Sequence, residues 1–176
     1  LRDVHEDGCA RGTVIEIRVT AISDEAAEAA EDVVVEEIRR LQAVFSAFDP
    51  SSELSRWRRG EVDEPSRELA ALLIAALGWQ ERGRGTFNPM VGVLTETWQE
   101  AERAGVPPDP DVLAALARSI TAPRYAVVDG RIGLTGDCRT LNLNAFAKGH
   151  VADAAAALVA GEPEIVSVVV NAGGDL

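Results

Sequence analysis

The residue types best suited to chemistry lie in two short segments, LNLNAFAKGHVAD at 141–153 and VVVNAGGDL at 168–176. The first reads as a short strand, a turn of small and amide residues, and a helix entered at 147–149. The second reads as a buried strand that ends on Gly173 and Gly174. Glycine backbone and a helix N-terminus both offer N–H groups that bind phosphate groups. The two segments therefore predict a phosphate or pyrophosphate site.

Lys148 gives a second indication of an anion. We expect it in the first turn of the helix, where a positive charge opposes the helix dipole. A nearby anion would compensate that charge, and a solvated lysine is the alternative. The pattern favours a phosphate close to this residue.

The sequence lacks the motifs of other common nucleotide-binding, metal-binding and catalytic sites. The chain has neither GxGxxG nor GxxxxGK[ST], so it carries no Rossmann fingerprint and no P-loop, and HExxH, CxxC and GxSxG are also missing. His5 and His150 are too few for a histidine metal cluster. Cys9 and Cys138 are best read as buried or free thiols, although a disulfide between them is possible.

The charge argues against nucleic-acid binding, and the hydropathy argues against a membrane-spanning segment. The net charge of −12 is unfavourable for binding nucleic acid, and the only concentrated basic run, 56–59, is read as a solvated helix end. The chain has no run of 18 apolar residues, so the sequence predicts no membrane-spanning segment. The N-terminal residues resemble neither a signal peptide nor a lipid-attachment site, so a cytoplasmic or an exported location stays open.

Apolar periodicity places the elements around these motifs. Apolar and polar residues alternate over 13–20, which predicts a half-buried strand. Apolar residues spaced by three and four then predict a long helix, which is capped by Ser23 and Asp24 and whose apolar stripe extends to Phe48. Further elements are expected at 53–59 (helix), 66–83 (helix), after Pro89 to about 105 (helix), 111–118 (helix), 125–135 (hairpin turning at Asp129-Gly130), 148–160 (helix) and 165–170 (buried strand). Together they predict an α+β fold in a single domain, 1–176.

Four segments, in order, resemble the ApbE family of FAD:protein FMN transferases. FSAFDPSSELSRW at 45–57 is similar to the family's FSRFDPxSELSRLN, and GTFNPMVGVLTETW at 85–98 to GAFDPTVGPLVDLW. LNLNAFAKGHVAD and NAGGDL match DLGGIAKGYAVD and NAGGD. Arg11-Gly12-Thr13 stands where the family shows MGT.

The resemblance implies an ApbE-like, T-fold-related α+β fold of mixed sheets with flanking helices, incomplete at its C-terminus. The family's SGDYxR and HIIDPxTG segments, and an Asp/Thr pair that binds metal, are absent from the chain. The implied function is a Mg²⁺-dependent flavin transferase that moves FMN from FAD to a Thr or Ser hydroxyl of a target flavoprotein, releasing AMP. The alternatives are a non-catalytic FAD- or FMN-binding protein of the same fold and a structural lobe without a ligand of its own.

Carried over by position, the resemblance implies a set of cofactor-binding residues, and Ala147 would offer its main-chain carbonyl to Mg²⁺. The catalytic base stays unknown. The cofactor-binding residues would be Arg11, Phe48, Thr86, Phe87, Asn88, Asn144 and His150.

Several of these residues have a second interpretation. Phe48 either stacks on a flavin or adenine ring or belongs to the core. Asn88 either contacts the cofactor or closes an Asx-Pro turn. Asn144 either binds the cofactor or closes its loop, and His150 stands where the family has an aromatic such as Tyr. Because Asn88 replaces the family's Asp, we expect Asn88→Asp to preserve or improve cofactor binding.

Overall fold

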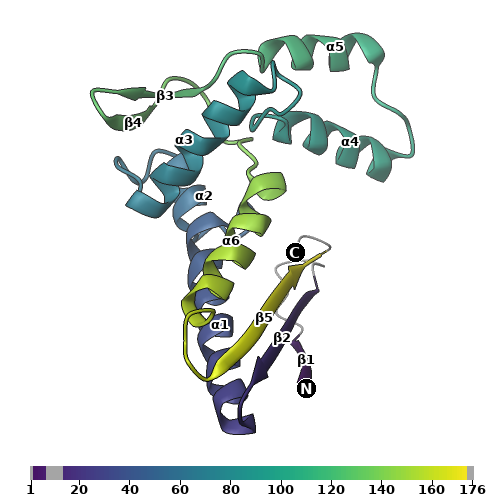
Figure 1. Cartoon of the computed structure of the whole chain (residues 1–176). Coiled ribbons are helices and arrows are strands. Elements are labelled where there is room, and N and C mark those ends of the chain that lie inside the picture. The colour runs from purple at the N-terminus through teal and green to yellow at the C-terminus, as the bar shows by residue number, and fades with distance from the viewer. Residues whose placement is uncertain (1, 7–13, 174–176) are drawn as a thin grey trace. The chain divides into compact units, whose positions relative to one another are not determined.

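The computed structural model describes residues 2–6 and 14–173, and residues 2–6 only as backbone. The chain folds into two compact units (Figure 1). The first combines residues 1–49 with 144–176, and the second consists of residues 50–143. Helices and antiparallel strands both contribute, so the expected α+β class is confirmed.

The first unit is a sheet covered on one face by two helices. Its strands pair in the order β1-β2-β5, all antiparallel, with β2 in the middle. α1 and α6 lie against β2 and β5 (Figure 1). The elements are β1 (Arg2–Glu6), β2 (Ile15–Ala21), α1 (Asp24–Phe45), α6 (Asn144–Val159) and β5 (Ile165–Ala172).

Alternation in β2 builds the core of this unit. Ile17 and Val19 are buried, whereas Arg18 between them is exposed, because successive side chains of a strand point to opposite faces. The register places Val170 of β5 opposite Ile17, so both strands present apolar side chains to the helices. The core is completed by Ala30, Val34, Ile38, Ala152, Ala155 and Val159.

The helix α1 begins as expected and ends earlier than its apolar stripe. The Ser23 hydroxyl accepts the N–H of Ala26 at the N-terminus. At the C-terminus the Ser46 hydroxyl accepts the N–H groups of Phe48 and Asp49, which turns the chain after Phe45. Phe48 therefore lies beyond the helix with 52% of its surface exposed, and the interpretation of Phe48 as a core residue is wrong.

The second unit is mostly helical, and residues with known local preferences begin and end its elements. Asp109 caps the helix that Pro110 opens, and Gly105 ends the preceding helix in the left-handed conformation. Asp129 and Gly130 both have positive φ, as a type I′ hairpin turn requires. The elements are α2 (Glu53–Arg58), α3 (Arg67–Arg82), α4 (Gly92–Ala104), α5 (Pro110–Ser119), β3 (Tyr125–Val128) and β4 (Arg131–Leu134).

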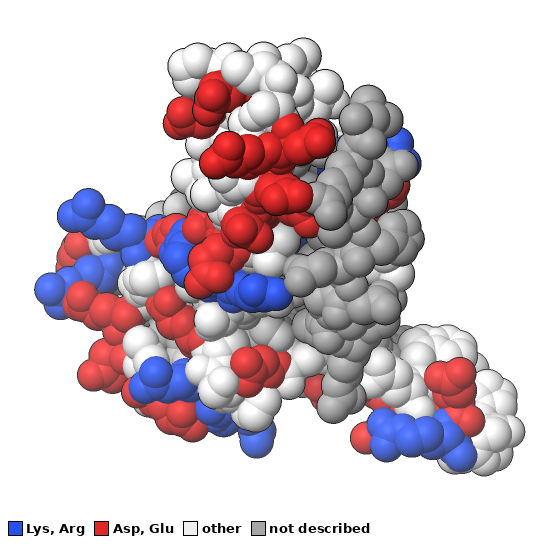
Figure 2. Space-filling model, turned by 90° about the horizontal axis from the view of Figure 1, so that it is seen from below, with Lys and Arg blue, Asp and Glu red and all other residues white. Residues whose placement is uncertain are grey.

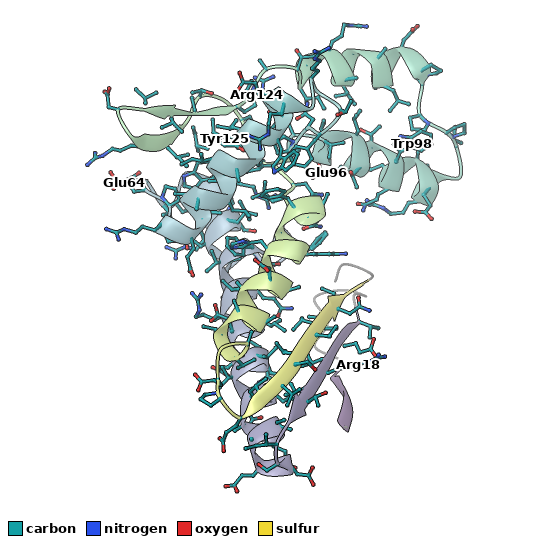
Figure 3. All side chains as sticks on the ribbon, viewed as in Figure 1. Arg18, Glu64, Glu96, Trp98, Arg124 and Tyr125 are labelled. Carbon is teal, nitrogen blue, oxygen red and sulfur yellow. The ribbon has the colours of Figure 1, made fainter. Side chains whose placement is uncertain are left out.

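An aromatic pair fixes the hairpin to the helices of this unit. Tyr125, which Figure 3 labels, meets Trp57 edge to face with ring centroids 5.8 Å apart. The Tyr125 hydroxyl donates to the Leu73 carbonyl oxygen at 3.1 Å. Burial raises the pKa of Tyr125 well above its usual value, so the phenol stays neutral and keeps its proton for this bond. The contact joins β3, α2 and α3.

Three elements differ from the sequence-based expectation. The helix α6 begins at Asn144, several residues before the predicted start. The strand β1 was not predicted, since RDVHE is charged and only its pairing with β2 stabilises it as a strand. β5 was predicted as buried, yet Val166 and Val169 are exposed because the described helices cover one face of the sheet.

The surface reflects the acidic composition. Figure 2 shows Asp and Glu side chains crowded over one part of the surface, whereas Lys and Arg side chains are spread over others. Among the described residues, none of the helices has the length and apolar character that a membrane span requires.

The core of the first unit can be tested with two neighbouring valines of α1. Val34 is fully buried and Val33 is 46% exposed. We expect Val34→Ala to lower the free energy of unfolding by about 2 kcal/mol, through lost burial and a cavity. Val33→Ala is the matched control and should change it by less than about 0.5 kcal/mol, since alanine favours the helix. Equal effects of the two variants in urea unfolding would contradict this packing.

Candidate functional site

The residues expected to contact the cofactor belong to both units of the structure. Arg11 lies outside the described residues. The first unit carries Phe48, Asn144, Ala147 and His150, and the second carries Thr86, Phe87 and Asn88.

In the first unit, Phe48 and His150 lie at the same end of the α1–α6 pair. The His150 ring contacts Phe45, the last residue of α1, edge to face with centroids 5.5 Å apart. Phe48 follows three residues later, and both His150 and Phe48 are exposed. An exposed aromatic and an imidazole at one end of a helix pair can together offer a stacking surface to a planar ring.

The start of α6 carries the remaining predicted residues of this unit. Asn144 is the first residue of the helix and is half-buried, and Ala147 is buried in the first turn. Because α6 begins at Asn144, Lys148 lies past the first turn, where the opposing field of the helix dipole is weaker. The inference of an anion from the position of Lys148 therefore loses its basis.

In the second unit, residues 86–88 lie in the bent connection between α3 and α4. The exposed Thr86 hydroxyl donates to the Gly83 carbonyl oxygen at 2.7 Å, and Phe87 is half-buried. Asn88 uses both ends of its amide within the chain. Its Nδ2 donates to the Ile120 carbonyl oxygen at 2.7 Å, and its Oδ1 accepts the Met90 N–H at 2.9 Å.

These hydrogen bonds support the Asx-Pro interpretation of Asn88. The acceptor closes the local turn around Pro89, and the donor reaches a residue at the end of α5. An aspartate could replace only the acceptor, since an ionised carboxylate has no N–H to donate.

Residues 138–143, which we call the 138–143 segment, lie against this turn. The Asn142 N–H donates to the Pro89 carbonyl oxygen at 2.7 Å. The Arg58 guanidinium donates through Nη1 to the Leu141 carbonyl oxygen at 2.6 Å. Gly92, the first residue of α4, approaches the Thr140 carbonyl oxygen so closely that a Cβ atom would overlap it. The segment is thus held by backbone contacts on one side and by an arginine from α2.

Sequence reasoning missed Arg58, because it placed the basic run 56–59 in solvent. The guanidinium is half-buried, and burial lowers the pKa of Arg58, while the carboxylate of Glu96 (labelled in Figure 3) partly offsets that effect. A signal was present, since Arg58 follows Leu54 by four positions, and Leu54 and Trp57 form the buried face of α2.

The cysteine in the 138–143 segment is structural. Cys138 is a buried free thiol, as expected, and its Sγ donates to the Arg124 carbonyl oxygen at 3.1 Å. Burial, together with the nearby Asp137 carboxylate, raises the pKa of the Cys138 thiol to about 11. Cys9 lies outside the described residues.

The described residues do not assemble a metal site of their own. Within residues 14–173, no three His, Cys, Asp or Glu side chains gather closely enough to bind an ion. Mg²⁺ prefers six oxygen ligands, and the Ala147 carbonyl would supply one of them at most.

Comparisons with known proteins identify the same family across the chain. The model of the ApbE family matches residues 11–176. A curated FAD:protein FMN transferase of Treponema pallidum (strain Nichols) is 31% identical over 180 residues, which cover 94% of this chain and 48% of that protein. The chain thus spans about half the length of this relative.

Solved structures share the fold. The flavin transferase ApbE of Vibrio cholerae superposes with a TM-score of 0.73 at 22% identity, covering 98% of this chain and 58% of that one. The apo form of the Pseudomonas stutzeri flavinyl transferase ApbE gives a TM-score of 0.75 at 16% identity, covering 98% and 59%. The ApbE-like fold expected from the sequence is confirmed.

The environment of Cys138 predicts low reactivity. A thiol with a raised pKa stays protonated at about pH 8, and the thiolate is the form that reacts. We expect iodoacetamide to leave Cys138 unmodified in the native protein and to modify it after unfolding in urea, as measured by peptide mass spectrometry. Rapid alkylation of native Cys138 would contradict the described burial.

Proposed function

The chain belongs to the ApbE family, and we propose that the protein carrying it is a FAD:protein FMN transferase. The observation that carries this proposal is the family match over residues 11–176, together with the 31% identity to a protein of that activity. The fold and the exposed aromatic end of α1 and α6 support it.

The proposed reaction is a phosphoryl transfer. The hydroxyl oxygen of a Thr or Ser in the target flavoprotein attacks the FMN-side phosphorus of FAD, and the bond from that phosphorus to the bridging oxygen breaks. AMP leaves with that oxygen, and the hydroxyl proton passes to a base that these residues do not identify. Positioning of the pyrophosphate and stabilisation of its developing charge would account for most of the rate acceleration.

We propose that Phe48 and His150 line the flavin site from the first unit, with Asn144 at the start of α6. Phe48 supports this role because it is an exposed aromatic that no helix covers. Thr86, Phe87 and Arg11 are proposed as further cofactor contacts on the family resemblance alone.

Magnesium is part of the proposal through the family resemblance, and when bound it would neutralise charge on the pyrophosphate. Ala147 is the residue of this chain proposed to bind it, through its main-chain carbonyl. Asp153 is a poor second ligand, since it lies in the third turn of α6 and is exposed. The described residues alone do not fit the ion, so no step of the reaction is assigned to them through it.

The binding role of Phe48 can be tested by substitution. We expect Phe48→Ala to weaken FAD binding by the full-length protein about tenfold, or about 1.4 kcal/mol, because a stacking surface is lost. FAD affinity is measured by flavin fluorescence quenching.

Leu158→Ala is the matched control, because Leu158 is an apolar residue of the same unit with a similar exposed fraction, 51%. The Leu158→Ala variant should bind FAD with the same affinity as the wild type. An unchanged affinity in Phe48→Ala would remove Phe48 from the site.

A second test separates the transferase from a non-catalytic flavin-binding protein. We expect the 176-residue chain, supplied with FAD, Mg²⁺ and a target domain carrying an acceptor threonine, to transfer no FMN. The physical reason is that the described residues lack a set of ligands for the ion. Mass spectrometry of the target domain detects the added FMN.

The positive control is the full-length protein under the same conditions. Transfer by the full-length protein supports the enzyme, whereas FAD binding without transfer favours the flavin-binding alternative. Metal-dependent flavinylation by the 176-residue chain would show that this account of the metal ligands is wrong.

A further inference from the structure

We propose that Asn88 and Gly92 are positioning residues: Asn88 ties the turn around Pro89 to the end of α5, and Gly92 lets the 138–143 segment pack on the start of α4. Together they hold residues 86–88 in the form that binds flavin. The inference rests on the proposed function, and it assigns Asn88 a role through the chain instead of a contact with the cofactor.

The hydrogen bonds of Asn88 are the first observation. Its Nδ2 is directed at the Ile120 carbonyl oxygen and its Oδ1 at the Met90 N–H. Both bonds are of normal length, and they join the end of α5 to the start of α4. An aspartate would place a carboxylate oxygen against the Ile120 carbonyl oxygen and lose the donor. This reverses the expectation that Asn88→Asp preserves or improves binding.

The approach at Gly92 is an independent observation. The atom that a Cβ would meet is the backbone carbonyl oxygen of Thr140, which cannot rotate away as the end of a flexible side chain could. Two positions from Thr140, the Asn142 N–H bonds to the Pro89 carbonyl oxygen. The two backbones therefore touch at two places, and only glycine allows the first of them.

Three consecutive residues of the 138–143 segment are held by different partners. Thr140 lies against Gly92, the Leu141 carbonyl accepts from Arg58, and the Asn142 N–H donates to Pro89. Such a segment cannot shift without breaking contacts to α2 and to the start of α4. By chain continuity it leads directly to Asn144, the first residue of α6.

The test combines hydrogen exchange with FAD titration in the full-length protein. The variants are Asn88→Asp and Gly92→Ala, and the control is Gly133→Ala, where an added Cβ meets no atom within 4 Å. We expect both variants to accelerate exchange of the Asn142 amide about tenfold and to weaken FAD binding about tenfold, with Gly133→Ala unchanged in both.

The outcomes separate the possible roles. If Asn88→Asp weakens FAD binding while the Asn142 amide stays protected, Asn88 contacts the cofactor directly and the proposal is overturned. Faster exchange with unchanged FAD affinity would also overturn it, because the contacts of the two residues would then serve stability alone. If Gly92→Ala does not fold, Asn88→Asp decides, since it keeps the acceptor for the Met90 N–H.

A wild-type protein that does not bind FAD would overturn the proposed function, and with it the role of Asn88 and Gly92 in flavin binding. That failure is distinguishable, because it is seen before any substitution is made. The exchange data would then still show whether Asn88 and Gly92 protect the Asn142 amide.

Discussion

The apolar core between strands β2 and β5 and helices α1 and α6 is the constraint on which the first unit depends. It joins two stretches of chain between which residues 50–143 are inserted, so its contacts must offset the entropy of closing that long loop. Ile17 and Val19 point to the same face of β2, and Val170 lies opposite Ile17 on β5, so both strands contribute to this core. The same packing sets His150 of α6 against Phe45 and so places two predicted flavin-contacting residues at one end of the helix pair.

The second unit has buried apolar side chains as well, and to these it adds close contacts between backbone segments. At the start of α4 the chain approaches the 138–143 segment closely enough that glycine is required, and a half-buried arginine holds the other side. Removing Arg58 would leave the buried Leu141 carbonyl without its charged donor, which is more costly than losing an exposed ion pair. The surrounding Trp57, Tyr125 and Cys138 are buried and neutral, and they form the apolar background of this contact.

The proposed activity places different demands on the two units. Flavin binding requires an accessible ring surface, and the exposed Phe48 and His150 provide side chains of that kind. It also requires turns that keep their shape, and the bonded Asn88 provides one. The transfer step further requires metal ligands and a base. The chain spans about half of its curated relative, and residues 14–173 gather no three His, Cys, Asp or Glu side chains placed to bind a metal ion, so these groups are the part of the proposal that rests on the family.

The sequence by itself determined the local elements and the family. The Ser23 cap and the Asp129-Gly130 turn depend on a few neighbouring residues, and the structure has both where they were expected. The ordered motifs likewise identified the ApbE family, which the comparisons confirmed.

Only the tertiary structure decided which side chains are available for chemistry. Phe48 continues an apolar stripe yet is exposed, because Ser46 ends the helix before it. Arg58 lies in a charged run yet is half-buried, because its partner at Leu141 is distant in the sequence. Asn88 matches a cofactor motif, yet its amide is bonded to Ile120. In the last two cases the partner lies 83 and 32 positions away, and local periodicity carries no information about contacts of that range.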